Sequence, residues 1–340
     1  MTILAVETSC DETAAAIVEN GTKLLANVVA SSQELHVTTG GIVPEVAARE
    51  QVKVIIPVID FTLKQAGCES CDIDGIAVTV GPGLIGSLLI GVETAKSLSF
   101  AWNKPLIAVN HLVGHIYANF INHPELADGS IFPSVVLVVS GGHSDLVLLK
   151  NHGEMQWLGG TLDDAAGEAF DKAARILGLG YPGGPAISEA ASTYLRRASF
   201  EALAKEDHLV LPRPLLHANN YDFSFSGLKT ALLTANQTKK YENTALAFEF
   251  QEAVVDCLVK KTIKAASHFN AKSIMLAGGV AANMRLREII GKSAGNIPLY
   301  YPEPKFCTDN AAMIGSAAFF NQTFVPWENL VPDSSLSLES

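Results

Sequence analysis

The feature that most constrains the fold is a strand–turn–strand unit that occurs twice. Residues 2–6 form an apolar run, the polar turn ETSCDET follows, and a second apolar run covers residues 14–18. Residues 134–150, SVVLVVSGGHSDLVLLK, repeat this plan around a turn of Ser, Gly and Asp. Two such units at the heads of two successive segments predict two lobes of similar design. The alternative is that β-hairpins resemble one another in any protein.

Apolar β-branched runs alternate with helical patterns through most of the chain, which is typical of an α/β fold. The turn-rich stretch at residues 123–134 predicts a boundary between lobes. We expect an N-terminal lobe of residues 1–130, joined by the C-terminal helix near residues 309–325, and a C-terminal lobe of residues 131–308. Within the first lobe, strands are expected at residues 76–80 and 106–109, and helices at residues 44–65 and 87–102.

Composition and charge exclude several classes of function. Hydrophobic residues make up 48% of the chain and charged residues 17%, as in a globular protein. The net charge of -11 argues against binding nucleic acid by bulk electrostatics, so such a partner would need a local basic patch or a helper protein. The first residues lack the basic region of a signal peptide, and the apolar runs are too short to span a membrane. Five scattered cysteines suit the reducing cytoplasm.

Two histidines form the clearest candidate site. His111 and His115 lie four residues apart in VNHLVGHIYANF, so on a helix they project from one face. The pair follows an expected strand, where active sites of α/β proteins lie. Asp309, just ahead of an apolar helix in FCTDNAAMIG, offers a third ligand. Two imidazoles and a carboxylate suit Fe(II) or Zn(II) with open positions. The alternative is a chance pair, with one histidine capping a helix and the other packed.

A zinc peptidase of the H-E-x-x-H type needs a glutamate directly after the first histidine as general base. Leu112 occupies that position here. A metal-dependent peptidase therefore loses its main support, and the metal is expected to hold a substrate.

The turn ETSCDET carries Glu7, Asp11 and Glu12, which would repel a phosphate. Acids in such a turn indicate metal chelation, water positioning or base catalysis. Asp11 and Glu12 are therefore the candidate catalytic acids. The alternative, a solvated acidic hairpin tip, is equally consistent with this motif.

Glycine-rich turns provide candidate nucleotide contacts. In LAGGVAANMRLR, Asn283 lies near a helix start, where backbone N–H groups can approach a nucleotide. In DDAAGEAFDKAARILGLGYPGGP, Asp171 could accept from a ribose hydroxyl, and the glycines near Gly184 could let a sugar or base approach. GPGLIG fits G-x-G-x-x-G, but no acid follows about 20 residues later, so a dinucleotide site is disfavoured and a close-packed turn is expected.

Taken together, these motifs resemble one family over nearly the whole chain. It is the catalytic subunit of the tRNA N6-adenosine threonylcarbamoyltransferases of bacteria and organelles, formerly described as sialoglycoprotein endopeptidases. The resemblance rests on AVETSCDETAAAIV, GGIVPEVAARE, GPGLIGSLLIG, NHLVGH, VVSGGHSDL, DDAAGEAFDKAARILGLGYPGGP, DFSFSGLKT, LAGGVAANMRLR and FCTDNAAMIG, in that order.

The resemblance implies the actin-like, sugar-kinase and heat-shock ATPase fold, with two duplicated lobes and an active site in the cleft between them. It implies transfer of a threonylcarbamoyl group from threonylcarbamoyl-adenylate to N6 of the adenosine beside the anticodon (A37), forming t6A in tRNAs that read ANN codons. It also implies two protein partners, a noncatalytic paralogue of the same fold and a small P-loop ATPase.

The site residues implied by the resemblance fall into two groups. His111, His115 and Asp309 match the metal ligands, usually assigned to one Fe2+, with Zn2+ an option in purified protein. The positions that match those holding the adenylate, ATP or AMP are Val138, Val139, Ser140, Gly141, Gly142, Asp171, Gly184 and Asn283. For tRNA, basic segments at Lys229, Lys239–Lys240, Lys260–Lys261, Arg285 and Arg287 are expected contacts.

Two positions depart from the family pattern: Val113 stands where many relatives carry Glu, and Gln51 where they often carry His. Neither is a matched ligand. Two rival functions stay open besides the peptidase. A sugar or acetate kinase of the same fold would give the histidine pair no role, and a noncatalytic partner protein should lack the pair.

Overall fold

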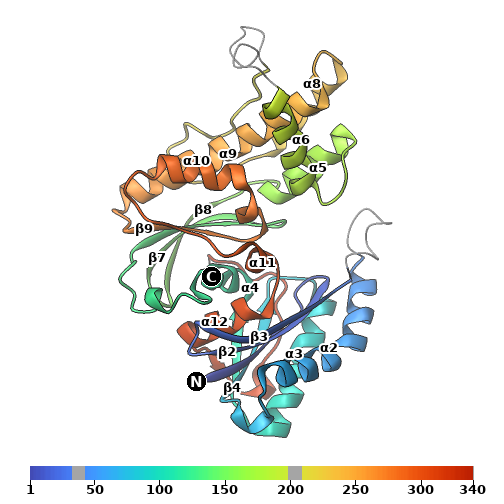
Figure 1. Ribbon diagram of the computed structural model, residues 1–340, viewed down its shortest axis with the longest axis vertical. Coiled ribbons are helices and arrows are strands. Elements are labelled where there is room, and N and C mark those ends of the chain that lie inside the picture. Colours follow the sequence, from blue (N-terminus) through green and yellow to red (C-terminus); the bar gives the residue numbers. More distant parts are fainter. Residues whose placement is uncertain (33–42, 198–208, 340) are drawn as a thin grey trace. The chain divides into compact units, whose positions relative to one another are not determined.

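The computed structural model describes residues 1–32, 43–197 and 209–339 (Figure 1). Residues 40–42 of the motif GGIVPEVAARE therefore lie outside the described residues. The chain divides into two compact units. Unit 1 contains Met1–Phe132, Lys150–Met155 and Tyr301–Ser340, and unit 2 contains Pro133–Leu149 and Gln156–Tyr300.

Unit 1 is built on a mixed six-stranded sheet of order β11-β5-β4-β1-β2-β3. The parallel pairs are β1 with β4 and β4 with β5, whereas β1–β2, β2–β3 and β5–β11 are antiparallel. The strands are β1 (Thr2–Glu7), β2 (Glu12–Glu19), β3 (Lys23–Ser31), β4 (Gly75–Gly81), β5 (Leu106–Asn110) and β11 (Phe324–Val325).

Helices cover both faces of this sheet. Alternate side chains of β1 and β2, including Leu4 and Ile17, form one core with Ile55 and Val92 of the helices α2 and α3. The opposite face packs on α12, where a Cβ on Gly315 would lie 2.7 Å from the Val18 side chain. The helices are α2 (Pro44–Ala66), α3 (Ile85–Trp102), α4 (His111–Tyr117), α11 (Pro304–Cys307) and α12 (Ala311–Asn321), with 3-10 turns η1 (Ser70–Asp72), η2 (Ala118–Phe120), η3 (Pro124–Leu126) and η5 (Trp327–Asn329).

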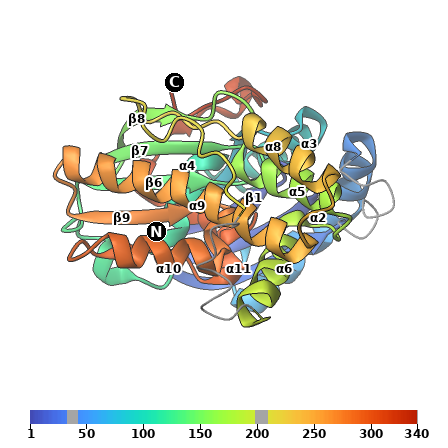
Figure 2. The ribbon, with the colours of Figure 1, turned by 90° about the horizontal axis from the view of Figure 1, so that it is seen from above.

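Unit 2 contains a five-stranded sheet of order β10-β9-β6-β7-β8, and α9 and α10 lie over one of its faces (Figures 1 and 2). Its strands are β6 (Ser134–Val139), β7 (Ser144–Asn151), β8 (Glu154–Gly160), β9 (Ser273–Ala277) and β10 (Leu299–Tyr300). Its helices are α5 (Ala166–Leu177), α6 (Gly183–Arg197), α8 (Ser226–Gln237), α9 (Asn243–His268) and α10 (Met284–Ser293), with the 3-10 turn η4 (Gly279–Ala282).

The predicted repeat is present in both sheets. β1–β2 and β6–β7 are the two antiparallel units, and each first strand also pairs in parallel with a later strand, β4 or β9. The order β5-β4-β1-β2-β3 is thus matched by β10-β9-β6-β7-β8. The α/β fold class is confirmed, as are the strands and helices expected in the first lobe. Among the described helices, none is both long and apolar enough to cross a bilayer.

The GPGLIG segment forms a close-packed turn, as expected. Gly81 and Gly83 have φ values of 153° and 159°, in the region that disfavours side chains. A Cβ on Gly83 would lie 2.5 Å from the backbone oxygen of Ser9, and one on Gly81 would clash with the backbone of Asp333. These glycines let the turn pack against the acidic β1–β2 turn and the C-terminal segment.

Candidate metal centre and nucleotide-binding elements

The histidine pair lies on the helix that follows β5. Asn110 caps this helix, since its side-chain oxygen accepts from the backbone N–H groups of Leu112 (2.8 Å) and Val113 (3.4 Å). His111 and His115 then project from one face, with their rings edge to face at a centroid distance of 4.7 Å. Both side chains are nearly buried. The sequence spacing thus produces the predicted geometry.

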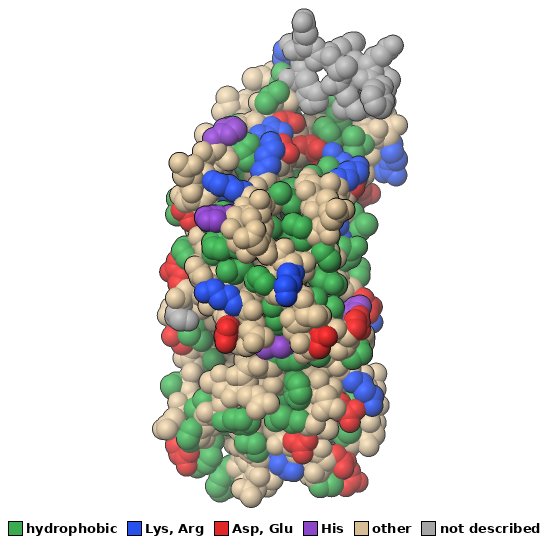
Figure 3. Space-filling model, turned by 90° about the vertical axis from the view of Figure 1, so that its left-hand side faces the viewer, with side chains coloured by type: hydrophobic (Ala, Val, Ile, Leu, Met, Phe, Trp, Pro, Cys, Tyr) green, Lys and Arg blue, Asp and Glu red, His purple; other side chains and the backbone are tan. Residues whose placement is uncertain are grey.

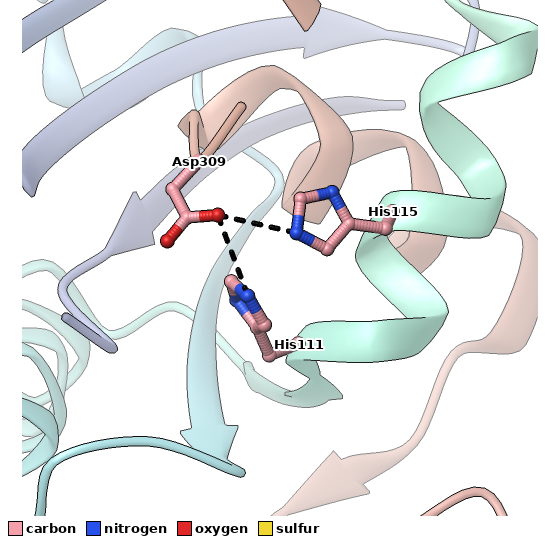
Figure 4. Close-up of side chains that lie close together, drawn as sticks. All are labelled: His111, His115 and Asp309. Carbon is pink, nitrogen blue, oxygen red and sulfur yellow. Dashed lines mark ion pairs between the residues drawn. The ribbon is translucent and has the colours of Figure 1, made fainter. Parts of the chain in front are cut away.

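Asp309 reaches the same point from the other end of the chain. The helix α12 is capped by Asn310, whose side chain accepts from Met313 N (3.1 Å), so capping does not occupy the Asp309 carboxylate. Asp309 Oδ1 lies 3.1 Å from His115 Nε2 and 3.5 Å from His111 Nε2 (Figure 4). Gly114 allows this approach, because a Cβ there would lie 2.7 Å from the Ile314 side chain of α12.

These three side chains could hold a metal ion. One ligand atom from each of His111, His115 and Asp309 lies within 4.8 Å of the others. Burial lowers the pKa of His111, but Asp309 and Glu7 outweigh this effect and raise it to about 9. Burial likewise disfavours the charged Asp309, yet the two histidines lower its pKa to about 2. A cation bound here would replace the proton that His111 holds beside the Asp309 carboxylate. The three donor atoms therefore fit a divalent metal.

The acidic turn is not a solvated hairpin tip, so that alternative is wrong. Asp11 is 7% exposed, and Glu12 is the first residue of β2. Burial, with the nearby charges of Asp309 and Asp11, raises the pKa of Glu12 to about 9. Glu12 therefore lies close enough to the metal ligand Asp309 and to Asp11 for their charges to act on its carboxyl.

Two further residues of this region were not assigned a role from the sequence. Glu7 faces His111, with 3.2 Å between Oε2 and Nδ1. Gln51 of α2 is buried, and its Nε2 donates to the backbone oxygens of Cys10 (3.0 Å) and Glu12 (2.9 Å). Neither residue has a spacing signal, because each acts across segments that are distant in the sequence.

The candidate adenylate-binding residues all lie in unit 2. Val138 and Val139 end β6, and Ser140, Gly141 and Gly142 form the turn to β7. A Cβ on Gly141, Gly142 or Gly184 would meet no atom within 4 Å, so these backbones border open space. Ser140 O accepts from Gly167 N of α5, and a Cβ on Gly278 would lie 2.4 Å from Val139 O. The β6–β7 turn thus adjoins the start of α5 and the end of β9.

Asp171 and Asn283 connect the remaining helix starts. Asp171 Oδ1 accepts from Gly183 N (2.7 Å) at the start of α6, and burial raises the pKa of this carboxyl. Asn283 caps α10 by accepting from Leu286 N (3.0 Å). Its Nδ2 donates to Ser188 Oγ of α6 and Gln251 Oε1 of α9, both at 3.1 Å. Both hydrogens of this amide are therefore engaged within the protein.

The motifs at residues 163–164 and 222–230 are connected by hydrogen bonds and an ion pair. The Asp163 carboxylate precedes α5 in the sequence but binds the start of α8. It accepts from the backbone N–H groups of Phe225 (2.7 Å) and Ser226 (3.2 Å) and from the hydroxyls of Ser224 and Ser226. Asp164 pairs with Lys172 and Lys229. Both acids thus stabilise the packing of α5 and α8.

Comparison with known proteins shows similarity over nearly the whole chain. The sequence model of the family described as "TsaD: tRNA N6-adenosine threonylcarbamoyltransferase" matches residues 23–316. A protein of that name from Thermomicrobium roseum is 50% identical over 94% of this chain and 92% of its own length. One from Bacillus subtilis is 49% identical over 93% of this chain and 89% of its own length.

Solved structures similar in fold are distant in sequence. HypF of T. kodakarensis has a TM-score of 0.61 at 14% identity, covering 97% of this chain and 49% of its own. Component A of the (R)-2-hydroxyglutaryl-CoA dehydratase of Acidaminococcus fermentans has a TM-score of 0.53 at 13% identity, covering 94% of this chain and 98% of its own. At such identities the likeness concerns the fold alone, which is that of the actin-like ATPases.

Proposed function

Because the chain belongs to the tRNA N6-adenosine threonylcarbamoyltransferase family, we propose that it transfers the threonylcarbamoyl group of threonylcarbamoyl-adenylate to N6 of the adenosine beside the anticodon of tRNA. The observation that carries this proposal is the identity of about half of the residues to proteins of that name over nearly the full length of both chains. The product is t6A in tRNAs that read ANN codons. A peptidase or a kinase is not favoured, since the relatives reported above bear the transferase name.

In this proposal His111, His115 and Asp309 hold one Fe2+, which Zn2+ can replace in purified protein. The geometry in support is the close grouping of two imidazoles and one carboxylate on α4 and the segment before α12. When bound to these three residues, a metal would supply Lewis acidity for the transfer of the threonylcarbamoyl group. Leu112 lies where a peptidase would have its catalytic glutamate, which is consistent with a metal that holds a substrate.

The transfer itself needs a correctly placed amine and a proton acceptor. The lone pair of N6 attacks the carbamoyl carbon, the bond from that carbon to the phosphate oxygen breaks, and AMP leaves with the electron pair. One N6 proton must go to a base, for which Asp11 or Glu12 is proposed. A raised pKa makes the ionised Glu12 carboxylate a stronger base than the carboxylate of an exposed glutamate. Since adenine N6 is a poor nucleophile, positioning contributes much of the rate.

The adenylate is proposed to bind at the β6–β7 turn and the adjoining helix starts of unit 2. Open space beside Gly141, Gly142 and Gly184 supports close approach of a ligand to the backbone. Val138, Val139 and Ser140 position that turn, and Asp171 can accept from a ribose hydroxyl through the carboxylate oxygen that does not bind Gly183. Asn283 contributes by fixing the start of α10, because its amide hydrogens are engaged.

Binding of tRNA is proposed to depend on partner chains, namely a noncatalytic paralogue of the same fold and a small P-loop ATPase. The basic segments expected to contact tRNA are largely engaged. Lys261 is buried, Arg285 pairs with Glu252 and Glu288, and Lys229 pairs with Asp164. On the face shown in Figure 3, Lys and Arg side chains lie among acidic and apolar ones. Within the expected set, the exposed lysines are Lys239, Lys240 and Lys260.

Exposed apolar side chains on two neighbouring helices of unit 1 support the involvement of a protein partner. The packed helices α2 and α3 expose Val52 (59%), Ile56 (57%), Ile85 (51%) and Leu89 (42%). Large exposed apolar surfaces commonly mark interaction sites. The cytoplasm is the proposed location, because five scattered cysteines suit a reducing compartment.

Reconstitution tests the proposed function. The purified chain and its partners are incubated with threonine, bicarbonate, ATP, the adenylate-forming synthase and unmodified tRNA, and nucleosides are analysed by mass spectrometry. We expect the threonylcarbamoylated adenosine to appear with the wild-type chain and to be absent without it. Appearance of this nucleoside at equal rate when the chain is omitted would refute the proposal.

A further inference from the structure

A buried carboxylate lies behind the histidine that begins α4. Glu7, at the end of β1, is 1% exposed. Its Oε2 lies 3.2 Å from His111 Nδ1, the ring nitrogen opposite the one that faces Asp309. Such a carboxylate can determine which nitrogen of a metal-binding histidine carries the hydrogen.

The other contacts of Glu7 fix its orientation. Oε1 accepts the backbone N–H of Ser9 (2.5 Å), and Oε2 accepts the hydroxyl of Thr79 (2.5 Å) on β4. A carboxylate is only an acceptor, so the atom of His111 that faces Oε2 must be a donor. Nδ1 therefore carries the hydrogen, and the lone pair of a neutral ring is at Nε2, on the side of Asp309 and His115.

Ser9 alone does not determine which ring nitrogen of His111 carries the hydrogen. Its hydroxyl lies 3.1 Å from His111 Nδ1, but a hydroxyl can either donate or accept. If Glu7 were neutral and turned away, Ser9 could donate to Nδ1 and favour the tautomer with hydrogen on Nε2. That tautomer has no lone pair for a metal at the nitrogen facing Asp309.

We propose that Glu7 is a positioning residue that holds His111 in the Nδ1–H form, so that Nε2 is the metal ligand. The inference rests on the metal site of the proposed function and adds a determinant of its affinity. Glu7 touches neither substrate nor metal in this account. Its effect passes through the His111 ring.

Glu7→Gln tests this inference with minimal change of shape. The backbone N–H of Ser9 requires an acceptor, so the amide oxygen of the variant takes the place of Oε1. The amide NH2 then faces His111 Nδ1 and, as a donor, favours the tautomer with hydrogen on Nε2. We expect the dissociation constant for Zn2+, measured by competition with a chromogenic chelator, to rise roughly 10–100-fold.

Glu249→Gln is the matched control. Glu249 is a glutamate of unit 2 that is also nearly buried, at 5% exposure, and it binds Leu211 N (2.9 Å) and Arg213. Its replacement removes a buried negative charge without contact to a metal ligand, so Zn2+ affinity should stay at the wild-type value. Equal affinity of Glu7→Gln and wild-type protein for Zn2+ would overturn the inference while leaving the metal site intact. Failure of the wild-type protein to bind Zn2+ would overturn both.

A second measurement is made on the wild-type protein and does not depend on the folding of Glu7→Gln. In the Zn2+-loaded wild-type protein labelled with 15N-histidine, we expect the His111 signal, assigned through its loss in His111→Gln, to show a slowly exchanging hydrogen on Nδ1. A hydrogen on Nε2, with Nδ1 bound to the metal, would contradict the assignment regardless of how Glu7→Gln behaves.

Discussion

At the scale of single residues, the site depends on one position without a side chain. Gly114 lies between His111 and His115 on α4, and the helix packs there against Ile314 and Met313 of α12. A side chain at this position must separate the two helices. Since the histidines are on one helix and Asp309 precedes the other, this separation would move the metal ligands apart.

We predict that Gly114→Ala destabilises the fold by about 1–3 kcal/mol, the usual cost of overpacking, and weakens Zn2+ binding. Chemical denaturation and chelator competition measure the two effects. Gly86→Ala in α3 is the control, because its new Cβ would meet Ala48 at an ordinary 3.6 Å. That variant should be as stable as wild type or slightly more stable. Full stability of Gly114→Ala would show that the helices are not packed as described.

Asp163 provides a prediction about pH. Burial works against its charge, but hydrogen bonds from Ser224, Ser226 and Phe225 hold its pKa below the usual value. A carboxyl with a depressed folded-state pKa stabilises the fold above its unfolded pKa, which is about 4, and loses this contribution as pH falls through the folded value.

Asp163→Asn should therefore lower the free energy of unfolding by about 1 kcal/mol at pH 7, as for loss of a helix cap. The difference from wild type should shrink below about pH 4, where the wild-type carboxyl becomes protonated. Urea denaturation at pH 7 and pH 3 measures it. Asp128→Asn, which removes a carboxylate bound to Ser130 N, should have a smaller effect. A difference that stays constant with pH would contradict this assignment.

At the scale of elements, α2 fixes the acidic turn between β1 and β2. The Gln51 amide donates to the backbone oxygens of Cys10 and Glu12, with a third and longer approach to Thr8 O at 3.4 Å. Members of the family that this sequence resembles often have histidine at this position. Either side chain can supply an N–H to the turn that carries Asp11 and Glu12.

We predict that Gln51→Glu, which places an acceptor against backbone oxygens, destabilises the fold by about 1–3 kcal/mol. Gln51→His keeps a donor and should retain most of the stability and of the t6A activity. Thermal unfolding and the reconstituted transfer assay compare the two variants. If Gln51→Glu were as stable and as active as Gln51→His, the described role of Gln51 in the turn would be wrong.

The elements also show which parts of the site can be predicted from sequence. The pair His111–His115 was predictable, because spacing on one helix is a local property, and Asp309 because it precedes an apolar helix. The helix that Asp163 caps depends on a tertiary contact, because its carboxylate accepts from Phe225 N, 62 positions along the chain. The role of Glu7 requires β1, β4 and α4 to meet, which no local pattern reveals.

At the scale of the whole molecule, the duplicated plan was predictable from two similar apolar hairpins. The third strand of each, β3 and β8, was not predicted. In β3 the apolar run is interrupted by Asn27 and only Ala26 is buried, and in β8 the first five residues are exposed or half-buried, so neither is a continuous buried run like β1 or β6. Their pairing is set by the neighbouring strand and not by their own composition.

The charge of the molecule makes a prediction about tRNA. With a net charge of -11 and several basic side chains paired, the isolated chain should bind tRNA weakly, and binding should fall steeply with salt. Lys239→Glu with Lys240→Glu should weaken binding in the complex and reduce its salt dependence. The control Lys292→Glu changes a lysine that already pairs with Glu288. Filter binding at several salt concentrations measures both effects. Equal salt dependence of tRNA binding for the wild type and the Lys239→Glu, Lys240→Glu variant would exclude the Lys239–Lys240 contact.

The central claim, that His111, His115 and Asp309 form a metal centre serving threonylcarbamoyl transfer, is tested most directly by a single-turnover measurement. Synthetic threonylcarbamoyl-adenylate is mixed with tRNA and excess enzyme, with wild type compared to His111→Ala and Asp309→Asn proteins of verified fold and measured metal content. We expect both variants to lose the metal and to transfer at least about 100-fold more slowly, since a Lewis acid contributes several kcal/mol. Transfer at the wild-type rate by metal-free His111→Ala would contradict the account.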